Sequence, residues 1–266
     1  MATSMTQISQ ADLRDDLGSP VPLTGPARRV VSLVPSLTEA IAATALDVLV
    51  GATDWCTHPA DLAVARVRGT KNPDRHAIEA LAPDLVVANK EENRELDVRR
   101  LREAGIAVWV TDIESVPQAL ASMERLVTQA LGVPVPLWLE RVRRAWQAPV
   151  PRTRGCVAVP IWRDPWMVVG RSTFTGDLLL RAGLGNVFGG ADGRYPHVEV
   201  EAIDEAGADL MLLPDEPYAF TASDGPEAFA RTPTRLVDGR LLTWYGPSLV
   251  HSREMLDQLA SELTAA

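Results

Sequence analysis

Short runs of aliphatic residues alternate with stretches of helical spacing along most of the chain. The runs RVVSLVPS, VLVGATD, DLVVAN and IAVWVTD, between residues 29 and 112, are nearly continuous in Val, Ile and Leu, which is typical of strands buried on both faces. Between them, SLTEAIAATAL, HAIEALAP and RELDVRRLREAG place apolar residues three and four positions apart, as helices do. Strands that alternate with helices predict a parallel sheet covered on both faces.

The middle of the chain has a helical pattern for a long stretch. SVPQALASMERLVTQALG and PLWLERVRRAWQ, between residues 115 and 147, are interrupted only by GVPVP. Their apolar residues recur at three and four positions, so one face is expected to be buried along its length. This stretch predicts a helical connection between two parts of the molecule.

The second half repeats the alternation of the first. Strands are predicted at GCVAVPIW, NVFGG, DLMLLPDE, TRLVDG and RLLTWYG, and helices at STFTGDLLLRAGL, HVEVEAIDEAG and SLVHSREMLDQLASEL. IEALAPDLVVANKEEN (78–93) returns as IDEAGADLMLLPDEPY (203–218), with the Asp before the apolar run kept in both copies. ALDVLVG (45–51) likewise matches GLGNVFG (183–189). Two correspondences in the same order predict two similar lobes.

The predicted fold class is therefore α/β, with a mainly parallel sheet flanked by helices in each lobe and a long helical backbone joining them. The predicted parts are an N-terminal tail (1–28), an N-terminal lobe (29–114), the linking helical backbone (115–150) and a C-terminal lobe (151–266).

The net charge and the cysteine content limit which partners and which cysteine-based sites are expected. A formal net charge of -9 argues against binding to nucleic acid or an anionic membrane, because both are negatively charged and bind basic protein surfaces. Cys56 and Cys156 are far apart and lack a metal-ligand spacing, so neither a disulfide framework nor a thiolate metal site is indicated. The first residues show no basic segment followed by an apolar run, and no run reaches the length of a membrane span. A cytoplasmic location without membrane insertion is therefore predicted.

The segments predicted to follow strands concentrate aromatic and acidic side chains. They are NKEEN (89–93), PIWRDPWM (160–167), PDEPYAF (214–220) and WYGPS (244–248), and the last three hold six of the chain's aromatic residues. Ligands of open parallel sheets bind beyond the carboxyl ends of the strands, and aromatic rings there offer flat surface to a planar ligand. The same rings could instead close the end of a core.

Two other kinds of chemistry stay open. Asp164, Asp215 and Glu216 could act as acid and base, provided that burial separates their pKa values. His58, His76, His197 and His251 show no HxH or HExxH spacing, yet three of them could converge on Zn or Mn; metal ligands therefore stay unknown. No P-loop, GxGxxG or GxSxG motif is present, which leaves phosphate-binding and hydrolase functions without support.

The segments SLVPSLTE, GTKNPD and ALAPDLVVAN, in this order, resemble the class III substrate-binding proteins. This is the helical-backbone metal receptor superfamily, and the chain most nearly resembles its cobalamin-binding branch over about residues 29–262. The resemblance implies two α/β lobes joined by a rigid helix, with a ligand held between them and little hinge motion. Its members pass corrinoids, haem, siderophores or metal ions to ABC transporters.

The resemblance also implies which side chains contact the ligand. By position these are Lys71, Asn72, Asn89, Lys90, Glu91, Trp162, Trp166, Arg171, Tyr218, Trp244 and Tyr245. Asp164, Asp215 and Glu216 lie on the same loops and complete the predicted ligand-binding set. Family members dock on the transporter through one exposed Glu per lobe. Here those positions hold Glu201 and His76, so one acidic partner is missing and handover to a transporter stays open.

We therefore predict a binding protein, not an enzyme, for a bulky metal-bearing or planar ligand, with a corrinoid as the first candidate. No cofactor is required, although a corrinoid, a tetrapyrrole or a metal chelate could be bound. Two alternatives remain: an enzyme on the same scaffold that uses the carboxylates on a polar small molecule, and a Zn or Mn carrier that uses the histidines.

Overall fold

The computed structural model describes residues 13–265, which form two compact units. The described part of the first unit comprises residues 13–112 and 120–140, and that of the second comprises residues 113–119 and 141–265. The helical segment predicted to link the lobes thus contributes residues to both units.

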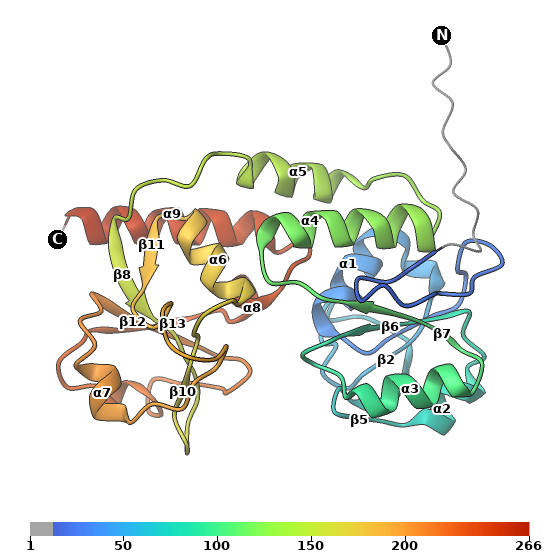
Figure 1. The fold of residues 1–266 in the computed structure, drawn as a ribbon, viewed down its shortest axis with the longest axis horizontal. Helices are drawn as coiled ribbons and strands as arrows, with labels where there is room; N and C mark the ends of the chain where they lie inside the picture. Colours follow the sequence, from blue (N-terminus) through green and yellow to red (C-terminus); the bar gives the residue numbers. More distant parts are fainter. Residues whose placement is uncertain (1–12, 266) are drawn as a thin grey trace, which may run out of the picture. The chain divides into compact units, whose positions relative to one another are not determined.

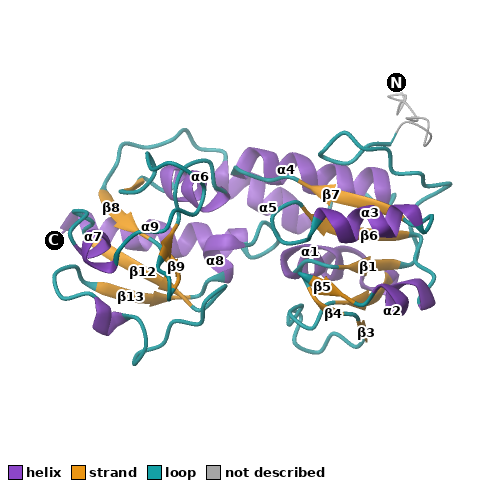
Figure 2. Cartoon of the chain, turned by 60° about the horizontal axis from the view of Figure 1, so that its bottom comes forward, coloured by secondary structure: helices purple, strands orange, loops and turns teal. Residues whose placement is uncertain are grey.

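A five-stranded parallel sheet forms the core of the first unit (Figure 2). Its order is β3-β2-β1-β6-β7. The strands are β1 (Val30–Ser32), β2 (Leu49–Ala52), β3 (Ala65–Arg66), β6 (Leu85–Asn89) and β7 (Ala107–Thr111). Every residue of β1, β6 and β7 is buried, as the nearly continuous aliphatic runs predict.

Helices cover both faces of this sheet. The unit contains α1 (Pro35–Ala45), α2 (Arg75–Ala80) and α3 (Glu95–Glu103), and a short hairpin of β4 (Arg68–Gly69) and β5 (Asn72–Pro73). Figure 1 shows α1 on one side of the strands and α2 and α3 on the other. Pro35 opens α1 at a position where its missing N–H costs nothing. Asp74 caps α2 by accepting the N–H of Ala77 at 3.1 Å.

The second unit has a four-stranded parallel sheet in the order β11-β8-β12-β13. Its strands are β8 (Gly155–Ala158), β11 (Leu184–Asn186), β12 (Leu210–Pro214) and β13 (Thr234–Val237). A hairpin of β9 (Pro160–Trp162) and β10 (Met167–Val168) follows β8. The helices are α6 (Phe174–Arg181), α7 (Val200–Asp204), α8 (Arg240–Thr243) and α9 (Leu249–Ala265).

The internal repeat has a structural basis. In each unit a short helix, α2 or α7, precedes the strand, β6 or β12, that lies between the first strand and the last. The repeated Asp performs the same task in both. Asp84 Oδ2 accepts the N–H groups of Arg28 and Arg29 at 2.8 and 2.9 Å, and Asp209 Oδ2 accepts that of Cys156 at 2.7 Å. Each carboxylate thus binds the backbone at the start of the unit's first strand.

The helical connection consists of two helices. α4 (Val116–Arg125) continues through a wider π-helical turn (Leu126–Ala130), and α5 (Leu137–Trp146) follows after a break. The break coincides with GVPVP, as predicted. Gly132 has φ +65°, and a side chain there would meet Pro26 at 2.6 Å, so the turn needs glycine both for its backbone and for the close approach.

Residues 13–28 pack against the first unit through buried acidic groups. Asp15, whose side chain is fully buried, accepts from Arg102 at 2.7 Å, and Asp16 accepts from Arg125 at 2.8 Å. Residues 1–12 of the predicted tail lie outside the described residues. Among the residues that the structure describes, no helix has both the length and the apolar character needed to cross a membrane.

Two strand predictions need correction. RLLTWYG is not a strand, because residues 240–243 form α8. Asp238 Oδ1 accepts the N–H of Arg240 two residues on at 3.0 Å, and such a local side-chain bond favours a turn over an extended strand. The strand predicted at NVFGG ends at Asn186, since Asn186 Oδ1 accepts the N–H of Phe188 at 3.0 Å and turns the chain.

Candidate ligand-binding site

The carboxyl ends of parallel strands meet at one edge of each sheet, and ligands of such sheets bind there. In the first unit this edge carries the residues that follow β2 and β6. In the second unit it carries the residues that follow β8, β12 and β13. The predicted contacts fall mainly on these loops, so each edge is considered by itself.

Asn89 shapes the turn after β6. It is buried, and its amide donates to Thr111 O and Oγ1 at 3.3 and 3.1 Å while its Oδ1 accepts the N–H of Glu91 at 2.8 Å. Asn93 completes the turn by accepting the N–H of Asn89 at 2.8 Å and donating to Thr70 O at 2.9 Å. These bonds engage the whole amide of Asn89, which therefore acts on a ligand only through the position of its neighbours.

Lys71, Asn72 and Lys90 are exposed, and Glu91 is half-buried. Lys71 donates to the backbone oxygen of Glu91, which joins the GTKNPD hairpin to the turn after β6. Lys90 forms an ion pair with Asp112 at 2.7 Å. The structure thus brings four of the predicted contacts of the first unit to one edge.

Trp55 is a candidate contact that the sequence analysis missed. It lies three residues after the end of β2, and the residue is 66% exposed. It lies next to the β4–β5 hairpin, since a side chain at Gly69 would come within 3.3 Å of Trp55 Nε1. The sequence pattern could have identified Trp55, because it follows a predicted buried strand, as Trp162 does in the second half.

The second edge carries a connected group of aromatic rings. Trp162 meets Tyr218 edge to face at 5.7 Å, Tyr218 contacts Phe220 at 4.7 Å, and Trp166 stacks on Phe220 at 5.8 Å. Trp166 and Tyr218 also pack against the core of the unit. Trp162, at the end of β9, is 42% exposed, so its indole is the ring of this group most available to a ligand.

Arg163 holds the loops of this edge together. Its guanidinium forms ion pairs with Asp224 and Glu227 and lies 5.5 Å from the ring centre of Trp166. The hydrogen bond from Arg163 lowers the pKa of Glu227. Tyr218 Oη donates to Asp224 at 2.6 Å, which raises the pKa of Tyr218. The aromatic surface therefore rests on a fixed polar network.

Trp244 and Tyr245 have different surroundings. Both are only 6% exposed, and Tyr245 meets Phe174 edge to face at 5.7 Å. The Arg240 guanidinium lies 5.9 Å from the ring centre of Trp244. In this conformation both rings fill the interior of the unit and offer little surface.

The predicted carboxylates differ in their environments. Asp164 has an 88% exposed side chain, whereas Asp215 Oδ1 accepts the N–H of Gly239 at 2.7 Å. Burial raises the pKa of the Glu216 carboxyl above its usual value, even though Thr243 Oγ1 donates to it at 3.1 Å. Asp215 and Glu216 thus fix the loops after β12 and β13. Arg171 pairs with exposed Asp192 at 2.9 Å.

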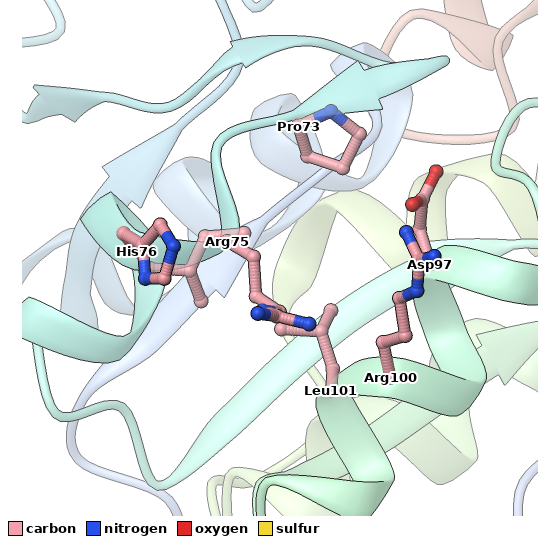
Figure 3. A pocket seen from close by; sticks show the side chains of 7 residues that line it. Pro73, Arg75, His76, Asp97, Arg100 and Leu101 are labelled. Carbon is pink, nitrogen blue, oxygen red and sulfur yellow. The ribbon is translucent and has the colours of Figure 1, made fainter.

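The two predicted docking positions lie on short helices. Glu201 is exposed in the first turn of α7, and His76 is exposed on α2. His76 borders a cavity of about 350 Å³ between α2 and α3, whose lining includes Arg75, Asp97 and Arg100 (Figure 3). The surface around His76 therefore carries charges of both signs.

No group of three or more His, Cys, Asp or Glu side chains that could hold a metal ion occurs within residues 13–265. All four histidines lie in this range. The alternative of a Zn or Mn carrier thus gains no support from either unit.

Comparison with known proteins identifies relatives of one kind. No family model matches the chain. It is 26% identical over 188 residues to a vitamin B12-binding protein of Vibrio vulnificus, covering 67% of this chain and 68% of that protein. It is 23% identical to a vitamin B12-binding protein of Pectobacterium carotovorum, covering 90% and 89%. A third relative, from Bacillus subtilis, is an uncharacterised ABC transporter substrate-binding lipoprotein, 30% identical over 47% of this chain and 41% of the relative.

Solved structures share the fold over nearly the whole chain. The periplasmic vitamin B12-binding protein BtuF of Vibrio cholerae aligns with a TM-score of 0.73 and 17% identity, covering 91% of this chain and 99% of that one. The periplasmic haem-binding protein BhuT with two haems aligns with a TM-score of 0.74 and 24% identity, covering 90% and 100%.

These relatives overturn the predicted cytoplasmic location, because they are periplasmic proteins or a lipoprotein. Fold and sequence similarity together confirm the resemblance to the class III substrate-binding proteins, near their vitamin B12-binding branch.

Proposed function

We propose that this protein binds a bulky planar ligand, a corrinoid in the first place, outside the cytoplasm and delivers it unchanged to an ABC transporter. The second unit supplies the aromatic surface through the loops after β8 and β12. The strand-end edge of the first unit, with Trp55, Lys71 and the turn after β6, is a second candidate surface and is tested separately. Vitamin B12-binding proteins among its relatives in sequence support the choice of a corrinoid.

One observation carries the proposal. Trp162 is a large apolar side chain that is 42% exposed at the carboxyl-end edge of a parallel sheet, and Tyr218 supports its ring. Exposing an indole forfeits the free energy that its burial would contribute. A ligand with a flat apolar face restores that burial, and an aromatic platform with few rotatable bonds loses little entropy on binding.

The polar groups suit binding better than turnover. Arg163, Asp215 and Glu216 are engaged with other parts of their own unit, and Asp164 is exposed to solvent. None of these carboxylates pairs with a base in the manner of a catalytic acid and base. The relatives named as substrate-binding proteins support the same interpretation.

Transfer to a transporter rests on the relatives and on Glu201. Glu201 is exposed on α7, as a docking carboxylate must be, whereas His76 at the corresponding position of α2 lacks the charge of a carboxylate. Docking would thus use a carboxylate on the second unit and a different contact on the first.

Equilibrium dialysis against hydroxocobalamin, with the ligand quantified by its absorption, tests the proposal. The protein is expected to bind one equivalent, and Trp162→Ala to weaken binding about tenfold, as expected for a central aromatic contact. Trp55→Ala tests the first unit in the same way. Leu180→Ala, which truncates an equally exposed apolar side chain on α6, is the matched control and should leave affinity unchanged.

Because Trp162 is half in solvent, its replacement should lower the free energy of unfolding by less than about 1 kcal/mol. A tenfold loss of affinity in a protein of unchanged stability would therefore report the contact itself. Equal affinity of the Trp162→Ala and wild-type proteins would remove this edge from the site.

A further inference from the structure

Three loops of the second unit carry more acidic than basic side chains, and this suggests which ligands they accept. Arg171 lies outside these loops and is paired with Asp192 at 2.9 Å. We infer that Asp164 makes the site selective for ligands whose periphery donates hydrogen bonds, such as carboxamides, over ligands whose periphery carries carboxylates. This inference rests on the proposed function and specifies the chemistry of its ligand.

The loops 159–167, 214–229 and 238–245 contain six carboxylates and two arginines. Both arginines are already paired within these loops. Arg163 bonds to Asp224 and Glu227, and Arg240 lies 3.6 Å from Asp238. A carboxylate of an incoming ligand thus meets guanidinium groups whose charge is neutralised, and breaking either pair to reach one would leave an acidic side chain unpaired.

Asp164 is the carboxylate best placed to meet a ligand. It follows Trp162 by two residues at the tip of the β9–β10 hairpin, and 88% of its side chain is exposed. Its backbone has φ +57°, a left-handed conformation that Asp tolerates better than most residues. Its distance to Arg163 Nε, 3.8 Å, is that of a weak pair beside the two bonds that Arg163 makes elsewhere.

An exposed carboxylate beside an apolar platform discriminates by charge. It accepts N–H groups from an amide, whereas it repels a second carboxylate at the same distance. Corrinoids with amide side chains can donate hydrogen bonds to Asp164. The propionates of haem are instead repelled by it. The fold is similar to those of both B12-binding and haem-binding proteins, so it does not distinguish a corrinoid from haem as the ligand. The charge of the loops favours the corrinoid.

Two corrinoids with the same ring and metal isolate the effect. Dicyanocobinamide carries amides at its periphery, and dicyanocobyrinic acid carries carboxylates. In equilibrium dialysis at low salt, the amide is expected to bind at least about tenfold more tightly, and 0.5 M NaCl should reduce this ratio because it screens the repulsion. Asp164→Asn should tighten binding of the acid about threefold and change that of the amide less than twofold.

Glu254→Gln on α9 removes the same charge from an exposed side chain outside these loops, and it should leave the ratio as in the wild type. Equal affinity for the two corrinoids, or a ratio that Asp164→Asn leaves unchanged, would overturn the inference while leaving corrinoid binding intact. Failure of both corrinoids to bind would overturn the proposed function, and the inference with it.

Discussion

Individual side chains at the second edge divide into those that face solvent and those that support them. Trp162 and Asp164 are exposed, whereas Trp166 and Tyr218 pack on the core and Arg163 joins two loops through Asp224 and Glu227. The sequence analysis places Trp162, Asp164, Trp166 and Tyr218 in one predicted set because they share two loops. Only the structure distinguishes the exposed side chains from the supporting ones, since exposure depends on packing between loops far apart in the chain.

Glu216 gives a pH-dependent prediction. Burial raises the pKa of its carboxyl in the folded protein, so the folded state holds the proton more tightly than the unfolded state does. Ionisation therefore costs stability, a cost that is absent at low pH and complete once the pH exceeds the folded-state pKa. Glu216→Gln should therefore increase the free energy of unfolding at pH 7.

Urea unfolding of both proteins at pH 4 and pH 7 measures this effect. The advantage of Glu216→Gln should vanish at pH 4, because the wild-type side chain is then mostly protonated. A variant that is less stable than the wild type at pH 7 would show that the ionised carboxylate is stabilising, contrary to this account.

The repeated elements show which parts of the fold could be predicted from sequence patterns and which could not. The helix–strand pairs α2–β6 and α7–β12 could be predicted because aliphatic runs, turn residues and a repeated Asp coincide in both halves. β3, β4 and β5 could not, since strands of two residues have no periodicity. The α8 turn was predicted as a strand because its apolar residues, Leu241 and Leu242, suit either structure, and the bond from Arg240 N–H to Asp238 favours the turn.

Prediction of the site was limited in the same way. Trp162 and Tyr218 could be assigned to one edge from strand order alone, and the structure brings them into contact. The internal bonding of Asn89 and the burial of Trp244 depend on tertiary contacts and could not be foreseen. Their roles as ligand contacts stay predictions, and the structure favours Trp162 and Trp55 over them.

The repeated Asp makes an element-scale prediction. Asp84→Ala removes the acceptor of two N–H groups before β1, and Asp209→Ala removes that of one N–H group in β8. Each variant should lose about 1 kcal/mol of unfolding free energy, with the greater loss for Asp84→Ala. Asp61→Ala, in an exposed loop, is the control. If all three variants unfolded at the same urea concentration, these hydrogen bonds would not stabilise the strands.

At the scale of the whole molecule, two units of the same topology each present a strand-end edge with an exposed Trp, and the chain shares its fold with periplasmic binding proteins. The central claim is therefore that the protein takes up a corrinoid reversibly and returns it unaltered.

Loading the protein with cyanocobalamin, desalting it, and recording the absorption spectrum before and after denaturation tests this claim most directly. We predict that about one equivalent of ligand stays with the folded protein and is released by denaturation with its spectrum unchanged. Loss of the colour on desalting would contradict corrinoid binding, and release of a chemically altered corrinoid would show that the protein is an enzyme.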